Sequence, residues 1–197
     1  CSFHKYGDYF PGTGDVSDLG YGKGKGYAIN FPLHDGMDDE SFVSIFRPVI
    51  TGIMENFKPE AVCLQCGADS LAGDRLGVFN LSLRGHSACV EYFDQLGLPL
   101  LVLGGGGYTM RNVARCWTYE TAKLLNVEVS NDLPPTKFFE YYTAQQEKSG
   151  SAETDYKLHI KKISSMRNEN SRNYLEVLGN RIHQQLKQIE CVPSVEI

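Results

Sequence analysis

Carboxylates and an arginine follow an apolar run near the middle of the chain. The run, residues 61–64, is typical of a buried strand, and Asp69, Asp74 and Arg75 lie in the glycine-containing stretch after it. Parallel sheets place their sites where a strand ends and the chain turns outward. There a carboxylate can bind a metal such as zinc, and an arginine can bind an anion. The alternative is that Asp69 caps a turn and Asp74 pairs with Arg75 at the surface.

A second apolar run, residues 100–103, ends in four consecutive glycines, residues 104–107, which are followed by Tyr108. Glycines let a backbone approach a ligand closely. A tyrosine hydroxyl delivered to a strand end can donate a hydrogen bond to a developing oxyanion. This second stretch therefore favours a functional interpretation of the first.

The elements that must position these residues alternate between strands and helices. Asp38 or Asp39 caps the first helix, and Pro48 inside it predicts a kink. Strands followed by helices indicate an α/β fold with an open, mostly parallel sheet and helices on both faces. We expect strands at residues 27–31, 61–66 and 100–103, and helices at about residues 38–57, 85–96, 111–125 and 173–189.

Composition and charge argue against several classes of function. A chain of 197 residues with 42% hydrophobic residues is long enough for one domain with an ordinary core. The net charge of −5 provides no basic field for nucleic acid, and no apolar run reaches the length of a membrane span. The six cysteines lie mostly in apolar contexts and predict reduced, buried thiols. Cys63 and Cys66 form a CxxC inside a strand, whereas a redox CxxC opens a helix.

Three stretches closely resemble the class I histone deacetylases: SFHKYGDYFPGTGD, QCGADSLAGDRLG and LGGGGYTMRNVARCWTYET. The resemblance runs from Cys1 to about Tyr142 and resumes at about Asp155. It implies zinc-dependent removal of acetyl groups from lysines of histone tails, in transcriptional repression. It also implies a nuclear protein, with a cytoplasmic pool possible, and an arginase-like, three-layer α/β fold.

The resemblance covers only the C-terminal part of a single deacetylase domain, which residues 1–197 would represent. The family's Asp-x-His metal ligands and its histidine pair are not found in this sequence, so we expect the chain alone to be inactive. Residues 143–154 depart from the family pattern and are polar and small, which predicts a mobile loop insertion.

The resemblance also assigns roles in chemistry and substrate binding. Asp69 matches the third zinc ligand, and Tyr108 matches the catalytic donor to the acetyl oxygen. Phe10, Leu76 and Gly106, together with Tyr108, match residues that line the acetyl-lysine tunnel. For Phe10 and Leu76 the alternative is ordinary core packing.

Further positions match sites of regulation. Arg75 and Arg111 match arginines that bind an inositol phosphate where corepressor subunits associate, and structural salt bridges are the alternative. Ser2, Phe3 and Tyr27 match positions whose backbone carbonyls bind a monovalent cation such as K⁺. The implied partners are acetylated histone tails and corepressor subunits, without sequence-specific nucleic-acid binding or membrane binding.

Three other functions are alternatives to deacetylation. The first is a dinucleotide-binding loop, which needs the motif GxGxxG. A motif that starts at Gly104 would have Thr109 in place of its last glycine, and one that starts at Gly105 would have Met110, so the motif is not present at these glycines. A non-catalytic scaffold is the alternative if the chain is a whole protein. A relative acting on small amides such as acetylpolyamines is a third alternative, against which the long class I motifs argue.

Overall fold

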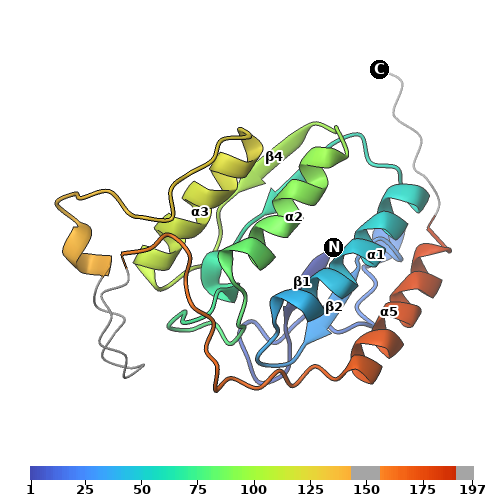
Figure 1. The fold of residues 1–197 in the computed structure, drawn as a ribbon. Helices are drawn as coiled ribbons and strands as arrows, with labels where there is room; N and C mark the ends of the chain where they lie inside the picture. Colours follow the sequence, from blue (N-terminus) through green and yellow to red (C-terminus); the bar gives the residue numbers. More distant parts are fainter. Residues whose placement is uncertain (143–155, 190–197) are drawn as a thin grey trace.

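The computed structural model describes residues 1–142 and 156–189, and the predicted loop insertion at residues 143–154 lies outside them. Parallel strands alternate with helices, so the predicted α/β class is confirmed (Figure 1). Among the described residues, no helix has the length and apolar composition needed to cross a membrane. The main elements are β1 (Ser2–Lys5), β2 (Asn30–Leu33), α1 (Asp39–Asn56), β3 (Val62–Gln65), α2 (Leu83–Gln95), β4 (Leu100–Leu103), α3 (Met110–Leu124) and α5 (Arg172–Leu186).

The strands form two parallel pairs. β1 pairs with β2, with Phe3 opposite Phe31, and β3 pairs with β4, with Leu64 opposite Val102. In the described ranges no strand lies between β1 and β3 to join the pairs into one sheet. The unpaired edge of β1 therefore faces the unpaired edge of β3. The space between these two edges is called the interval below.

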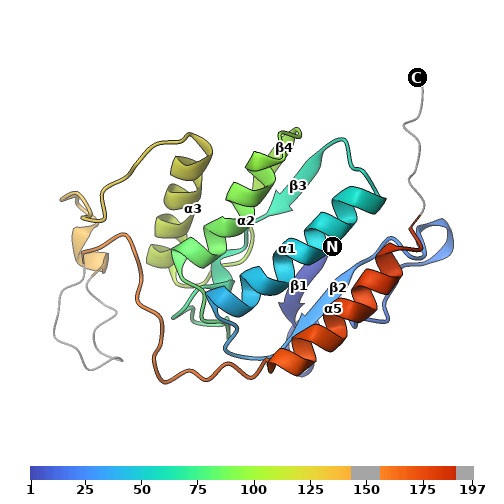
Figure 2. The same cartoon turned by 45° about the vertical axis from the view of Figure 1, so that its right-hand side comes forward.

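The helices follow the predicted positions closely because their caps are well defined. The Asp38 carboxylate accepts a hydrogen bond from the Ser41 N–H at 2.9 Å and begins α1. The hydroxyl of Ser82 accepts from the Gly85 N–H at 3.2 Å and begins α2. Helices α1, α2 and α3 lie in a row beside the strands, and α5 packs against α1 and β2 (Figure 2).

The predicted strand at residues 27–31 was placed too early, since β2 is Asn30–Leu33. The preceding backbone is used in turns: the N–H groups of Gly26 and Ala28 both donate to the Leu19 carbonyl. Those N–H groups cannot also join a ladder, so pairing with β1 begins later.

Two clusters of buried side chains hold these elements together. In the larger cluster Phe46 of α1, Phe93 of α2 and Ile182 of α5 are buried, and Phe3 of β1 packs against them. The smaller cluster, which includes Ala68, Leu71, Leu83, Val113 and Cys116, lies around the segment after β3. This second cluster fixes the segment that carries Asp69.

The expectation that β3 and β4 are buried strands was wrong for half of their residues. Cys63 and Gln65 of β3 are exposed, and Leu101 and Leu103 of β4 are 57% and 45% exposed. Successive side chains of a strand point to opposite faces. Val62 and its neighbours on the same face pack into the larger cluster, whereas the other face has no cover in the described part of the chain.

Candidate active site

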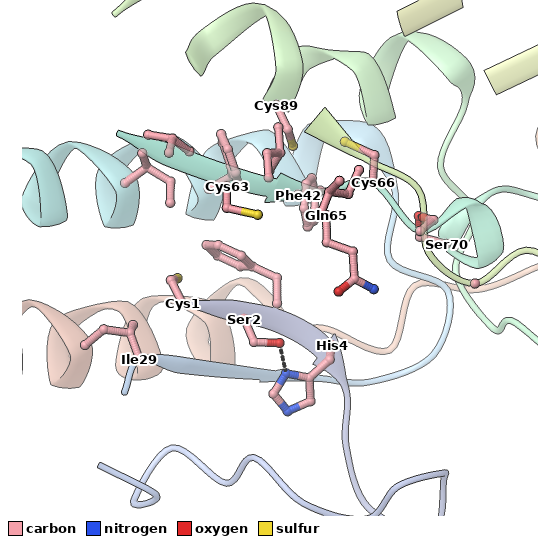
Figure 3. Close-up of a pocket in the computed structure, with 18 of the residues that line it drawn as sticks. Cys1, Ser2, His4, Ile29, Phe42, Cys63, Gln65, Cys66, Ser70 and Cys89 are labelled. Carbon is pink, nitrogen blue, oxygen red and sulfur yellow. Dashed lines mark hydrogen bonds between the residues drawn. The ribbon is translucent and has the colours of Figure 1, made fainter. Parts of the chain in front are cut away.

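A cavity of about 1450 Å³ opens between the two strand pairs. The side chains of Cys63 and Gln65 extend from β3 toward β1 (Figure 3). Ser2 and His4, which are joined by a hydrogen bond, lie on β1 across the cavity from them. Residues from α1, including Phe42 and Phe46, also line it. Most of the predicted site residues meet here, namely Ser2, Phe3, Phe10, Tyr27, Asp69, Gly106 and Tyr108.

Asp69 lies in the short 3-10 helix η2 (Ala68–Ser70), which directly follows β3. Its carboxyl group is partly buried and has no ion-pair partner within residues 1–142 and 156–189. Burial raises the pKa of the Asp69 carboxyl, and the nearby charge of Asp74 raises it further. A divalent cation would offset both effects, so this carboxylate fits the part of a metal ligand.

Gly106 lies against this carboxylate. A Cβ atom on Gly106 would be only 2.1 Å from Oδ2 of Asp69. The Ala68 N–H donates to the Gly106 carbonyl at 2.7 Å, which holds the two segments at this separation. The glycine is therefore required by the position of Asp69, in addition to its predicted place in the cavity wall.

The alternative in which Asp74 forms a surface pair with Arg75 is wrong, because no ion pair joins the two among the described residues. Oδ1 of Asp74 accepts from the N–H groups of Leu76 and Gly77 at 2.9 and 2.8 Å. Its Oδ2 accepts from the N–H group of Tyr108 at 2.8 Å. Turn chemistry could have indicated the first two contacts, but the third spans 34 residues of sequence.

The structure excludes core packing for Phe10 and Leu76, the two predicted tunnel residues for which it was the alternative. Phe10 is 90% exposed and Leu76 is 53% exposed. Phe10 lines the cavity, whereas Leu76 lies beside it and accepts through its carbonyl a hydrogen bond from the Tyr9 hydroxyl at 3.0 Å. Tyr108 is 43% exposed and lines the same cavity, so its phenol is accessible to a ligand. Sequence reasoning did not identify Tyr9.

Arg75 and Arg111 do not line the cavity. Arg75 is exposed, and Arg111 lies in the first turn of α3 with its Nε atom buried and without a hydrogen-bond partner in the described structure. Burial lowers the pKa of the Arg111 guanidinium. No salt bridge of either arginine is formed within the described residues, which leaves donors for an anion.

The three residues matched to a cation site differ in their surroundings. Ser2 Oγ lies 2.8 Å from Nδ1 of His4, and the ring of Phe3 packs on Phe31 with centroids 5.7 Å apart. Their side chains are thus engaged elsewhere, so only backbone carbonyls remain for a cation. Binding of K⁺ by Ser2, Phe3 and Tyr27 stays a prediction.

A buried histidine behind the Asp69 segment was missed from the sequence. His86 Nδ1 lies 2.6 Å from Glu120 Oε1, and its Nε2 lies 2.8 Å from the Gly67 carbonyl oxygen. Burial alone would lower the pKa of His86, but hydrogen bonds with Cys116 and Glu120 outweigh it, so the pKa is raised well above its ordinary value. Both ring nitrogens face acceptors, which an imidazolium satisfies. The only signal was a histidine on the apolar face of a predicted helix.

The thiols near this pair lack the lowered pKa of a reactive thiol. Burial and the charge of Glu120 raise the pKa of Cys66 to about 12, whereas a reactive thiol has a lowered pKa. The five described cysteines are free; Cys66 and Cys116 are buried as predicted, but Cys1 and Cys63 are exposed. The exposed pair lines the cavity between the two strand pairs, where the described residues form no further strand.

Comparison with known proteins identifies the family. The family model described as Histone deacetylase domain matches residues 1–124. Human histone deacetylase 1 is 54% identical over 196 residues, and the Drosophila melanogaster histone deacetylase HDAC1 is 55% identical over 196 residues. The alignments cover 100% of this chain but 38% and 36% of those relatives. The chain, which spans less than two fifths of the length of these relatives, therefore belongs to the histone deacetylase family.

Proposed function

We propose that this chain supplies part of the active site of a zinc-dependent protein-lysine deacetylase. The observation that carries the proposal is the meeting of Asp69, Gly106 and Tyr108 in one cavity. The names of the relatives support acetylated histone tails as substrates, and through them roles in chromatin regulation, transcriptional repression and the nucleus. Acetylpolyamines are a weaker alternative, because no relative named above is a polyamine deacetylase.

Zinc fits the donor at this site but needs more ligands than the described residues provide. A catalytic zinc ion takes three protein ligands and keeps one position open. Asp69 offers one carboxylate; the described cluster His86, Cys116 and Glu120 does not include it. When bound, zinc supplies Lewis-acid polarisation of the amide carbonyl and activation of water. The other two ligands are proposed to come from outside this chain, which would leave the chain inactive alone.

The residues of this chain perform the remaining tasks. The Tyr108 hydroxyl donates a hydrogen bond to the acetyl oxygen as negative charge develops on it during attack on the amide. Phe10 and Leu76 offer exposed apolar surface to the methylene groups of the lysine side chain. Gly106 leaves the space beside Asp69 free for the carboxylate. Together these contacts hold an acetylated lysine with its carbonyl toward Asp69.

The interval between β1 and β3 supports the idea that a further segment completes the site. Neighbouring strands of a sheet lie about 4.8 Å apart, and both β1 and β3 have an edge without a strand partner in the described residues. Both strands also belong to parallel pairs. We therefore propose that a parallel strand of the longer deacetylase domain fills the interval. Its carboxyl end would lie beside Asp69, where further metal ligands are needed.

The arginines and the strand carbonyls support proposals about regulation. The unpartnered Nε atom of Arg111 suits an inositol phosphate, because a guanidinium binds phosphate through paired N–H groups. Arg75, which is exposed, is assigned to the same anion, and a corepressor subunit to the surface beside it. Binding of K⁺ by carbonyls of Ser2, Phe3 and Tyr27 is a separate proposal.

The test uses the protein expressed from its full native coding sequence. The wild type should contain about one zinc ion per molecule and hydrolyse an acetyl-lysine peptide. Asp69→Ala should lose the zinc, and Asp69→Asn should retain it more weakly, because an amide is a poorer ligand than a carboxylate. Normal zinc content in Asp69→Ala would refute the ligand assignment. A zinc-loaded wild type without activity on acetyl-lysine peptides would refute the function and favour a non-catalytic scaffold.

A further inference from the structure

We propose that Asp74 is a positioning residue whose single carboxylate sets the place of Tyr108 and of the turn that carries Leu76. The proposal rests on the function proposed above and adds a residue to it. Asp74 itself is not assigned any contact with substrate or metal. It acts through the backbone of the residues that make those contacts.

The carboxylate of Asp74 joins two segments that are far apart in sequence. Oδ1 accepts from the N–H groups of Leu76 at 2.9 Å and Gly77 at 2.8 Å. Oδ2 accepts from the N–H groups of Tyr108 at 2.8 Å and Thr109 at 3.2 Å. Each oxygen thus holds one segment, and the separation of the two segments is fixed by one rigid planar group.

Other hydrogen bonds place the same junction on the scaffold. The Thr109 hydroxyl donates to the Gly73 carbonyl at 3.0 Å, and the Asn112 amide donates to the Ala72 carbonyl at 3.3 Å. On the far side, the Tyr9 hydroxyl donates to the Leu76 carbonyl at 3.0 Å. The Asp74 turn is therefore connected to the start of α3 and to the segment that carries Phe10.

The direction of the Tyr108 side chain depends on this backbone anchor. The Tyr108 hydroxyl has no hydrogen-bond partner among the residues that the structure describes, and the side chain is 43% exposed. A partly exposed phenol without a partner of its own is oriented by its main chain. A small shift in that main chain would move the hydroxyl relative to Asp69, and a 1 Å error at a reacting centre can cost roughly 100-fold in rate.

Only a carboxylate can serve all four donors. An ionised carboxylate accepts through both oxygens, whereas an asparagine amide has one accepting oxygen and one NH₂ group. Asp74→Asn therefore keeps the shape of the side chain but places a donor against one pair of N–H groups. Either the Leu76 turn or the Tyr108 turn must then move.

The experiment compares Asp74→Asn with a matched control in the full-length zinc-loaded protein. Asp39→Asn is the control, since the Asp39 carboxylate also bridges two segments, accepting from the N–H and hydroxyl of Ser82 at 2.8 Å, away from the cavity. Asp74→Asn should lower kcat on an acetyl-lysine peptide by about tenfold or more at unchanged zinc content. Asp39→Asn should lower the melting temperature at an unchanged kcat.

A double-mutant cycle separates positioning from general stability. In the Tyr108→Phe background, Asp74→Asn should lower kcat by less than about twofold, because the hydroxyl that it positions is already absent. Amide hydrogen exchange in the metal-free protein should accelerate at Leu76, Gly77, Tyr108 and Thr109 in Asp74→Asn. If Asp74→Asn does not fold, Thr109→Val removes only the hydroxyl bond to Gly73 and should give a smaller fall with the same dependence on Tyr108.

Full kcat in Asp74→Asn, or an equal loss in both backgrounds, would overturn the positioning role while leaving the deacetylase proposal intact. So would unchanged exchange at the four amides. A wild-type protein that binds zinc and hydrolyses no acetyl-lysine peptide would instead contradict the underlying function. In that case accelerated exchange at the four amides would still support Asp74 as the group that orders both segments.

Discussion

The carboxylate of Asp69 occupies the space in which a side chain on Gly106 would begin. An added Cβ would lie 2.1 Å from Oδ2 of Asp69, a separation that atoms in contact do not adopt. The segment after β4 therefore serves as a wall for the carboxylate as well as the carrier of Tyr108. The Asp69 carboxylate can occupy its position only because Gly106 has no side chain.

Gly106→Ala should therefore displace the Asp69 carboxylate. We expect zinc affinity to fall by about 10- to 100-fold, as for loss of a group that orients a ligand. Competition with a chelator measures the affinity. Gly179→Ala is the control, because a Cβ there meets nothing within 4 Å, and it should raise helix stability by about 0.5–1 kcal/mol. Unchanged zinc affinity in Gly106→Ala would contradict this prediction, because it would show that the Asp69 carboxylate can still bind zinc with a methyl group beside it.

The pair of His86 and Glu120 predicts a pH-dependent stability. The pKa of folded His86 is raised above its ordinary value of 6.5, so the pair stabilises fully below about pH 6.5 and this contribution is lost as the pH rises through the folded pKa. Glu120→Gln leaves a buried imidazole without its charged partner and should cost about 3–5 kcal/mol of unfolding free energy at low pH.

Urea unfolding at pH 6 and at alkaline pH measures the effect of Glu120→Gln. The difference from wild type should be larger at pH 6 and should shrink as His86 loses its proton. Ser87→Ala, at a buried neighbour on α2, is the control and should show a difference that does not vary with pH. A loss in Glu120→Gln that is equal at both pH values would mean that His86 is neutral in the folded protein.

Much of the scaffold was predictable because it depends on local signals. Asp38 as a cap and the one-sided apolar pattern after it gave α1 within about one residue, and the apolar runs gave β3 and β4. The division of the strands into two pairs was not predictable, since pairing partners are long-range. The exposure of Cys63 follows from the uncovered face of β3 and β4, and no property of residues 61–64 indicates it.

The site was predictable only in part, and for a similar reason. Asp69 and Tyr108 follow apolar runs that end in turns, which is a local pattern, whereas their roles came from the resemblance of the motifs. Asp74 was visible as a carboxylate, but its bond to the Tyr108 N–H depends on how two strand ends meet in space. His86 gave no chemical signal, because a histidine inside an amphipathic helix is usually part of the core.

The exposed Cys63 gives a test of the proposed strand between β1 and β3. In the folded full-length protein the proposed strand, together with the segments that continue from it over the exposed face of β3, would cover the Cys63 thiol, so alkylation by iodoacetamide should be at least about tenfold slower than in urea-denatured protein. Buried Cys116 should be slow as well and provides the reference for a protected thiol. Mass spectrometry of the labelled peptides measures both rates. Equal rates for Cys63 in folded and denatured protein would leave the interval open and contradict the proposed strand.

The arginines predict a link between an anion and a partner. Replacing both Arg75 and Arg111 with methionine should weaken association with a corepressor subunit and its activation of the enzyme, with a smaller effect on basal deacetylation. High salt should have the same effect, because it screens exposed phosphate contacts. A pull-down and a melting curve measure these effects. The exposed pair Arg172 and Arg181 on α5, replaced in the same way, is the control.

A purely structural role of the two arginines predicts a different outcome. If Arg75 and Arg111 serve only the fold, the double variant will lose thermal stability and basal activity together. A destabilised double variant that still binds its partner normally would refute the phosphate assignment. The Nε atom of Arg111, which is buried without a hydrogen-bond partner in the described structure, is the structural reason to expect weakened partner association rather than a loss of stability.

The central claim is that Tyr108 stabilises the developing oxyanion of an acetyl-lysine amide, and Tyr108→Phe tests it most directly. The change removes one hydroxyl from a partly exposed side chain, so zinc content and melting temperature should stay as in wild type. Steady-state kinetics with an acetyl-lysine peptide should show kcat lower by about 100-fold or more, with KM nearly unchanged. An unchanged kcat with a raised KM would mean that Tyr108 is only a wall of the cavity.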